Sequence, residues 1–176
     1  MATNLQFIKS NSASSVSSMD ITDCFTDQYD VYAIMIDNFD IGSGVDLAVR
    51  LRNSSGVVSS ANYDDAVQLM RSYGGGFGDN NDENDTKWKS FGFYDPQGGI
   101  GQGVAIGTTI YIFNPTNTSS YTFALWQNAG VSSIGTPVRK GIGVLKQTAS
   151  MTGINFNASS SILNIRARIY GLRVDS

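Results

Sequence analysis

The sequence predicts an all-β protein: a single antiparallel β-sandwich with a jelly-roll-like layout over residues 1–176. Residues 107–127 (GTTIYIFNPTNTSSYTFALWQ) pair two β-branched and aromatic runs around a polar turn, which is typical of a β-hairpin. The 22 serines, 19 glycines and 14 asparagines, against one glutamate and five lysines, favour turns over helices. Short apolar stretches also recur at sandwich spacing. An immunoglobulin-like sandwich gives the same alternation, so both topologies remain open.

In the first third of the chain, the predicted strands differ in how they distribute apolar side chains. Val31–Ile36 is apolar on both faces, which predicts a central strand in a sheet covered on both sides. In Val45–Arg52 the residues Val45, Leu47, Val49 and Leu51 alternate with polar ones and are expected to face inward. The strands predicted here are Asn4–Ser10, Val16–Thr22, Asp30–Phe39 and Val45–Arg52.

The remaining predicted strands follow the same two-residue period. In one of them, Tyr121, Phe123 and Leu125 share one face and Thr122, Ala124 and Trp126 share the other. In the last, Leu163, Ile165, Ala167 and Ile169 are expected to face inward. The strands predicted here are Trp88–Tyr94, Val104–Phe113, Tyr121–Asn128, Gly141–Lys146, Gly153–Phe156 and Leu163–Gly171.

Two segments between these groups are less regular. Asn62–Ser72 starts with a residue that can cap a helical turn, yet Tyr63, Val67 and Leu69 also suit an edge strand, which is our prediction. Gly74–Thr86 (GGGFGDNNDENDT) is predicted to be one long exposed loop. Because no change of composition or internal repeat divides the chain, a single domain is expected.

Composition excludes several functional classes. The net charge of −3 and the 15% of charged residues argue against a nucleic-acid-binding protein, which normally has a strongly basic face. No run approaches the ~20 apolar residues of a membrane-spanning helix, and the N-terminus lacks the pattern of a secretory signal. The single cysteine, Cys24, is expected to be a buried, inert thiol in a protein made in a reducing cytoplasm.

Catalytic constellations are missing from the sequence. Histidine is absent, which removes the commonest general base and every Ser-His or Cys-His pair. Two carboxylate pairs can be nominated for glycoside hydrolysis, Asp20 with Asp23 and Asp64 with Asp65, but neither lies in a catalytic motif. We therefore expect no enzyme, no catalytic residue and no cofactor.

Metal and phosphate motifs are likewise incomplete. Asp79, Asn81, Glu83 and Asp85 offer oxygen ligands for calcium at alternate positions, but the segment lacks the central glycine and distal glutamate of an EF-hand. A solvated acidic loop without metal is the favoured interpretation. Gly74–Gly76 and Gly98–Gly103 are expected to be turns, because neither continues into a phosphate-binding motif.

Two groups of side chains have both a functional and a structural interpretation. Arg50, Arg52, Arg166 and Arg168 would form one basic stripe if their strands were neighbours, although arginines also simply solubilise a wet sheet face. The aromatic residues Tyr111, Phe113, Tyr121, Phe123 and Trp126 could stack on a sugar, but the hydrophobic core is the favoured location for them.

Four segments carry a resemblance to a known family. They are ATNLQFIKSNSASSVSSMDITDCFTDQYDVYAIMID, GTTIYIFNPTNTSSYTF, KGIGVLKQTASMTGINF and IRARIYGL, and they are distributed over most of the chain. In these segments the sequence resembles small virion-associated proteins of marine tailed phages, cyanophages in particular. The resemblance implies a β-sandwich in the virion, at the head surface or in the tail, and brings no catalytic or ligand residue with it. Gly74–Gly76 and Asp79–Asp85 look like local elaborations of this pattern.

The functional expectation is therefore a non-enzymatic structural component of a tailed-phage virion, either a capsid decoration or a tail-associated protein. It would be assembled in the host cytoplasm, bind other virion proteins, and form a homo-oligomer, for which a trimer is favoured. The alternative is a receptor- or glycan-binding module of a tail fibre that recognises the host surface through loops at one end of the sandwich. Binding to nucleic acid or membrane is not expected.

Overall fold

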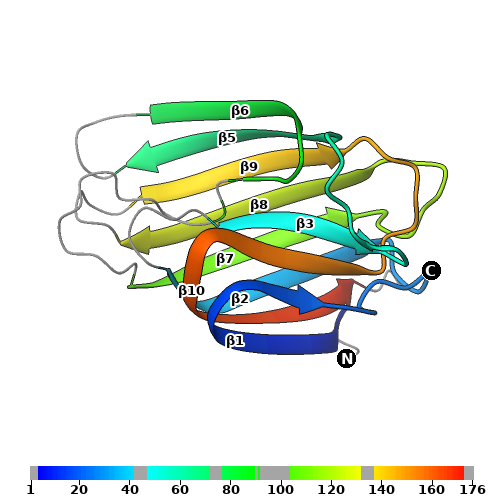
Figure 1. Cartoon of the computed structure of the whole chain (residues 1–176), viewed down its shortest axis with the longest axis horizontal. Helices are drawn as coiled ribbons and strands as arrows, with labels where there is room; N and C mark the ends of the chain where they lie inside the picture. The colour runs from blue at the N-terminus through cyan, green and yellow to red at the C-terminus, as the bar shows by residue number, and fades with distance from the viewer. Residues whose placement is uncertain are drawn as a thin grey trace.

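Antiparallel β-strands make up the computed structural model of the chain, which describes residues 4–41, 47–71, 77–89, 91, 104–131 and 137–172. The described residues contain no helix, so the predicted all-β class is confirmed. The strands are β1 (Leu5–Ile21), β2 (Val31–Ile41), β3 (Leu47–Asn53), β4 (Gly56–Val57), β5 (Tyr63–Arg71), β6 (Phe77–Asp85), β7 (Val104–Phe113), β8 (Thr122–Val131), β9 (Pro137–Leu145) and β10 (Gly153–Leu172). Figure 1 shows their arrangement.

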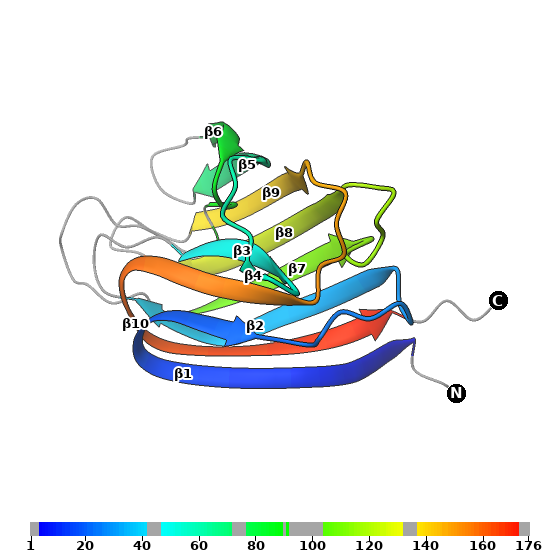
Figure 2. The ribbon, with the colours of Figure 1, turned by 45° about the vertical axis from the view of Figure 1, so that its right-hand side comes forward.

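All strands belong to one sheet with the order β4-β3-β10-β2-β7-β8-β9-β5-β6. Strand β1 is outside this order and pairs with β10 along the edge of β10 that is opposite to β2 and β3. The first part of β10, from Gly153 to Ala158, pairs with β3, whereas the part from Ile162 to Leu172 pairs with β2. Because β1 and β10 bend together, the sheet curls back over itself and brings β3 and β4 across its concave face (Figures 1 and 2). This half-barrel is consistent with the predicted β-sandwich or jelly-roll-like fold.

The two bent strands are longer than the sequence predicted. Asn4–Ser10 and Val16–Thr22 merge into β1, and Gly153–Phe156 and Leu163–Gly171 merge into β10. Residues 11–15 and 157–161 in the joining stretches are small serine, alanine and asparagine residues, which lack the apolar alternation of a strand. In β1 the joining stretch nevertheless pairs with Asn164–Ala167 of β10, because an extended backbone satisfies its hydrogen bonds by pairing whatever its side chains are.

The acidic segment is the main correction to the predicted elements. Within Gly74–Thr86, the described residues do not form a loop, because Phe77–Asp85 is the edge strand β6, paired with β5. An edge strand faces water and can carry charges instead of apolar residues, so it lacks the usual signature. Asn62–Ser72 is confirmed as a strand, although β5 lies inside the sheet between β9 and β6.

The burial of the side chains tests which face of each predicted strand points inward, and some predicted residues lie outside the part of the chain that the structure describes. Tyr121, Phe123 and Leu125 are exposed while Thr122, Ala124 and Trp126 are buried, so the two faces of β8 are as predicted. The expected inward residues of β3 and β10 are buried where described, namely Leu47, Val49, Leu51, Ile165, Ala167 and Ile169. Gly74–Gly76, Gly98–Gly103, Val45, the side chain of Leu163, Ser90 and residues 92–94 lie outside the described residues. Trp88 makes an isolated bridge to Val49.

Two indole rings fill the concave face over β9. Trp126 covers Gly141, and Trp88 covers Gly143, where an added Cβ would lie 2.7 Å from the indole nitrogen. Phe91 stacks on Trp126 at a ring-centroid distance of 4.4 Å. The core therefore presses directly on the backbone of β9 at Gly141 and Gly143, and the side chains of Ile142 and Val144 lie on the opposite, outer face of the sheet.

Candidate functional site

The outer face of β7, β8, β9, β5 and β6 carries four cross-strand rows of side chains, which the strand register sets. The first row is Phe113, Phe123, Val144 and Asp64, and the second is Tyr111, Leu125, Ile142, Ala66 and Asn81. The third row is Thr109, Gln127, Lys140, Gln68 and Asp79, and the fourth is Ala129, Val138, Met70 and Phe77. Neighbours in a row lie side by side on adjacent strands.

Apolar side chains in these rows are unusually exposed. Ile142 is 56% exposed, Phe123 45%, Leu125 42% and Tyr111 39%. In the fourth row, Phe77 is the most exposed of the large hydrophobic residues. Single exposed apolar residues are normal on a protein surface, but contiguous ones mark a place where another molecule binds.

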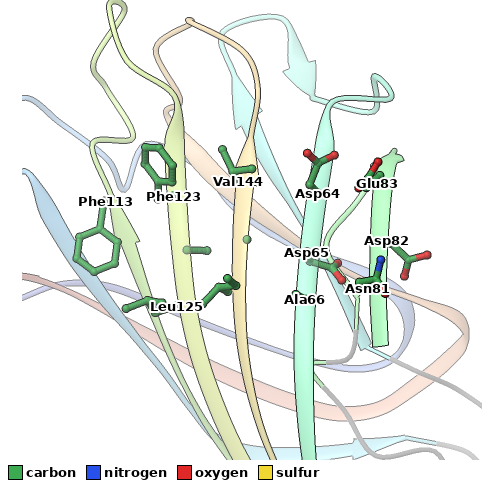
Figure 3. Close-up of a pocket in the computed structure, with 13 residues that line it drawn as sticks. Asp64, Asp65, Ala66, Asn81, Asp82, Glu83, Phe113, Phe123, Leu125 and Val144 are labelled. Carbon is green, nitrogen blue, oxygen red and sulfur yellow. The ribbon is translucent and has the colours of Figure 1, made fainter. Parts of the chain in front are cut away.

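A groove of about 600 Å³ runs across the strands between the first and second rows. Figure 3 shows Phe113, Phe123 and Val144 along one side, and the groove continues past Asp64 to Glu83 on β6. Two hollows of about 290 and 450 Å³ lie on the other side of the second row, between it and the third row. Over β7, β8 and β9 the second row is therefore a ridge with a groove along each side, and the row is lower at Ala66 on β5.

The groove is apolar over β7, β8 and β9 and acidic over β5 and β6. The Asp64 carboxylate lies 2.8 Å from the Lys146 ammonium and accepts a hydrogen bond of 2.8 Å from the Asn84 backbone. The hydrogen bond from Lys146 lowers the pKa of Asp64, so this carboxylate stays ionised. In the described part of the chain, Asp79 and Glu83 have no ion pair, and neither does Lys140 in the third row.

Asp65 lies on the opposite face of β5 from Asp64. It is 6% exposed, and one carboxylate oxygen accepts a 2.8 Å hydrogen bond from the Lys89 backbone, while the other has no partner. Burial is the largest cause that raises the pKa of Asp65 to about 6. The Lys89 ammonium pairs with Asp82 and Asp85 nearby. Asp65 is thus shielded from solvent and anchors the segment that positions Trp88.

The nominated carboxylate pairs do not form an acid–base site. Asp64 and Asp65 point to opposite faces of one strand, so they cannot flank a substrate together. Asp20 is occupied by Arg52 at 2.7 Å and by Asn155 at 2.6 Å, and Asp23 is in a separate turn with a φ of 54°. Asp20, Asp64 and Asp65 therefore each have structural partners, and neither nominated pair brings two carboxylates to one site.

The four nominated calcium ligands do not converge either. Asp79 and Asn81 are spread along the outer face of β6, whereas Asp85 binds Lys89. Between residues 4 and 172, in the ranges that the structure describes, no group of three or more His, Cys, Asp and Glu residues is placed to hold a metal ion.

The four arginines that were considered for a basic stripe do not form one. Arg166 and Arg168 both bind Asp37, and Arg166 is the largest cause that lowers the pKa of this carboxyl. Arg52 binds Asp20, and Arg50 donates to the Thr86 carbonyl at 3.1 Å. The two pairs are apart because β3 borders one half of β10 while Arg166 and Arg168 lie on the other half.

The favoured core location holds for only one member of the aromatic set. Trp126 is buried, whereas Tyr111, Tyr121 and Phe123 are exposed and Phe113 is half-buried. The alternation in the sequence separates Trp126 from Phe123, but it does not reveal which face a second layer covers. Cys24 is buried as predicted, and burial raises the pKa of its thiol to about 12, so the thiol is inert.

Comparisons with known proteins identify no family. No family model and no curated protein matches the chain. Among solved structures, a Crh5 transglycosylase in complex with NAG is 11% identical, with coverage of 93% of this chain and 78% of that chain, at a TM-score of 0.26. The apo Crh5 transglycosylase is 11% identical, with coverage of 92% and 88%, at a TM-score of 0.21. Similarity this low carries no argument about function.

No helix among the described residues is long and apolar enough to cross a membrane. The feature that the geometry does provide is the outer face: four side-chain rows, an apolar groove and an acidic strand at its end. The functional argument therefore concerns what binds to this face.

Proposed function

We propose that the chain is a non-enzymatic structural component of a tailed-phage virion, a capsid decoration or tail-associated protein that binds other virion proteins through its outer face. The single observation that carries the binding part is the contiguous exposure of Tyr111, Phe123, Leu125 and Ile142 on neighbouring strands. Aromatic and aliphatic side chains of this kind form the buried centres of protein interfaces. The virion part rests on the sequence resemblance.

A protein partner fits the chemistry of the groove better than a sugar does. Its largest side chains are Phe113, Phe123 and Leu125, and the Asp64 carboxylate already binds Lys146. Sugar hydroxyl groups need polar partners with free hydrogen-bonding capacity, and most of this groove offers none. Apolar side chains of a partner protein would lose water on binding here, which favours association.

Peptide mapping of purified phage particles tests the virion part of the proposal. Peptides of this chain should co-purify with the major capsid protein through a density gradient and remain after a salt wash. A non-structural phage protein from the same lysate is the control and should be absent. Particles that contain no peptide of this chain would overturn the proposal.

A host-glycan-binding module is the second candidate, because the Tyr111, Tyr121 and Phe123 rings are exposed enough to stack on a sugar. A glycan array distinguishes the two functions. Saturable, sugar-competed binding that is lost in Phe123→Ala but kept in Phe7→Ala would favour the glycan module. Phe7 is the matched control because it is exposed on β1, at the other edge of the curled sheet.

A further inference from the structure

We propose that the outer face binds a second copy of this chain, with β9 of each copy facing β5 of the other across a two-fold axis parallel to the strands. This inference rests on the proposed function, because it names one partner of the same protein-binding face. The argument has two parts, the shape of the rows and the placement of their charges.

The shape of the face is self-complementary about such an axis. Ile142 on β9 protrudes, and its row neighbour on β5 is the small Ala66, beside which the grooves open. An axis between β9 and β5 sets Ile142 of each copy over Ala66 of the other. In the fourth row the same operation sets Val138 over Met70. Because the axis is two-fold, the contact between the protruding Ile142 of one copy and the hollow at Ala66 of the other occurs twice in the pair.

The charges follow the same symmetry. Lys140 on β9 is exposed, and Asp79 lies two strands away in the same row, on the far side of Gln68. The proposed axis sets Lys140 over Gln68 of the other copy, within reach of its Asp79. The third row, which holds these charges, lies between the second and fourth rows, so apolar contacts would flank each ion pair. Partial exclusion of water strengthens such a pair.

Alternative arrangements lose these matches. An axis along β9 itself would set Lys140 against Lys140 of the other copy, and like charges repel. Pairing of two β6 edges would bring Asp79, Asp82 and Glu83 of both copies together, which acidic edge strands prevent. The pair about the axis between β9 and β5 is therefore the one of these arrangements that sets Ile142 over Ala66 and brings opposite charges together in the third row.

Sedimentation equilibrium of the purified full chain at micromolar concentration tests the proposal. The wild type should form a dimer, and Ile142→Asp should weaken its association at least about tenfold, because a charge would be buried in the contact. Phe7→Asp, at the far edge of the sheet, is the matched control and should dimerise like the wild type. Circular dichroism and thermal melting show that each variant is folded.

A charge exchange provides the sharper test. The Lys140→Glu variant and the Asp79→Lys variant should each be monomeric when measured alone, because in either homodimer both ion pairs become like-charge contacts. An equimolar mixture of the two variants should restore the dimer, since every contact then joins opposite charges. A surface that merely tolerates substitutions would not show this rescue.

A wild type that stays monomeric, a wild type that forms a trimer, or a mixture that fails to associate would each overturn the two-fold pair. Such a result leaves the virion proposal intact if peptide mapping finds the chain in particles. Conversely, a dimer that is absent from particles supports the pair and overturns the virion function.

Discussion

At the residue scale, the structure separates two adjacent carboxylates that look alike in the sequence. Asp64 faces outward and binds Lys146, while Asp65 is buried among the side chains that hold Lys89. The sequence contains a signal for this, since Tyr63 and Val67 share the face of Asp65 and are both buried. That signal alone does not predict that Asp65 is buried, because carboxylates are seldom buried without a partner and the sequence does not show which residue the partner is.

The raised pKa of Asp65 predicts a specific pH dependence of stability. Its pKa is about 6 in the folded protein against 3.8 for the unperturbed group, so between these values the folded state holds a proton that the unfolded state has released. The contribution of Asp65 to the unfolding free energy should therefore fall as pH rises from 4 to 6, by up to about 3 kcal/mol. Asp65→Asn should lack this fall.

Urea denaturation at a series of pH values measures this difference between wild type and variant. Asp27→Asn, in the exposed turn between β1 and β2, is the matched control and should follow the wild type. The lowered pKa of Asp37 gives the opposite sign, namely loss of stability as pH falls, but Asp37 lies on β2 and acts equally in both proteins. Parallel wild-type and Asp65→Asn curves would contradict this account of Asp65.

The glycines of β9 give a second prediction at this scale. Gly141→Ala should destabilise the protein by roughly 1–3 kcal/mol or more, because its new methyl group would overlap the Trp126 ring and force the core to repack. Gly107→Ala is the control, since nothing lies within 4 Å of a Cβ added there. Thermal denaturation of both variants checks the prediction, and equal melting temperatures would show that Trp126 moves aside without cost.

At the element scale, apolar alternation predicted most strands but not the acidic one. Tyr121–Asn128 was predictable because Phe123 and Leu125 alternate with Ala124 and Trp126. The run GDNNDEND has no such alternation, yet β6 pairs along β5 from Phe77 to Asp85. Its charges suit an edge that must not pair with other chains, and this reason becomes visible only once the sheet order is known.

Hydrogen exchange tests whether β6 is a strand. Amides of residues 77–85 that face β5 should be protected relative to the exposed turn at Asn117–Ser119, because the ladder to β5 bonds them. Exchange of the whole segment at the rate of that turn would instead support the loop that the sequence predicted. Asp82→Asn with Asp85→Asn should reduce the protection, since these carboxylates bind Lys89.

At the scale of the whole molecule, the sequence predicted the fold class but not how the two layers arise. A count of separate short strands missed β1 and β10, which bend together and carry the sheet from one layer to the other. For the same reason the sequence did not reveal that the face bearing Phe123 and Leu125 lies outside the sandwich. The candidate surface follows from the layer arrangement, so residue patterns alone did not locate it.

The central claim is that the outer face of β7, β8 and β9 is buried against protein partners in the assembled particle. Hydroxyl-radical footprinting of purified particles, compared with the isolated chain, tests it most directly. The account predicts that Tyr111, Phe123 and Leu125 are oxidised much more slowly in particles, because subunits cover their exposed rings and side chains. Equal oxidation of these three residues in particles and in the isolated chain would contradict the claim.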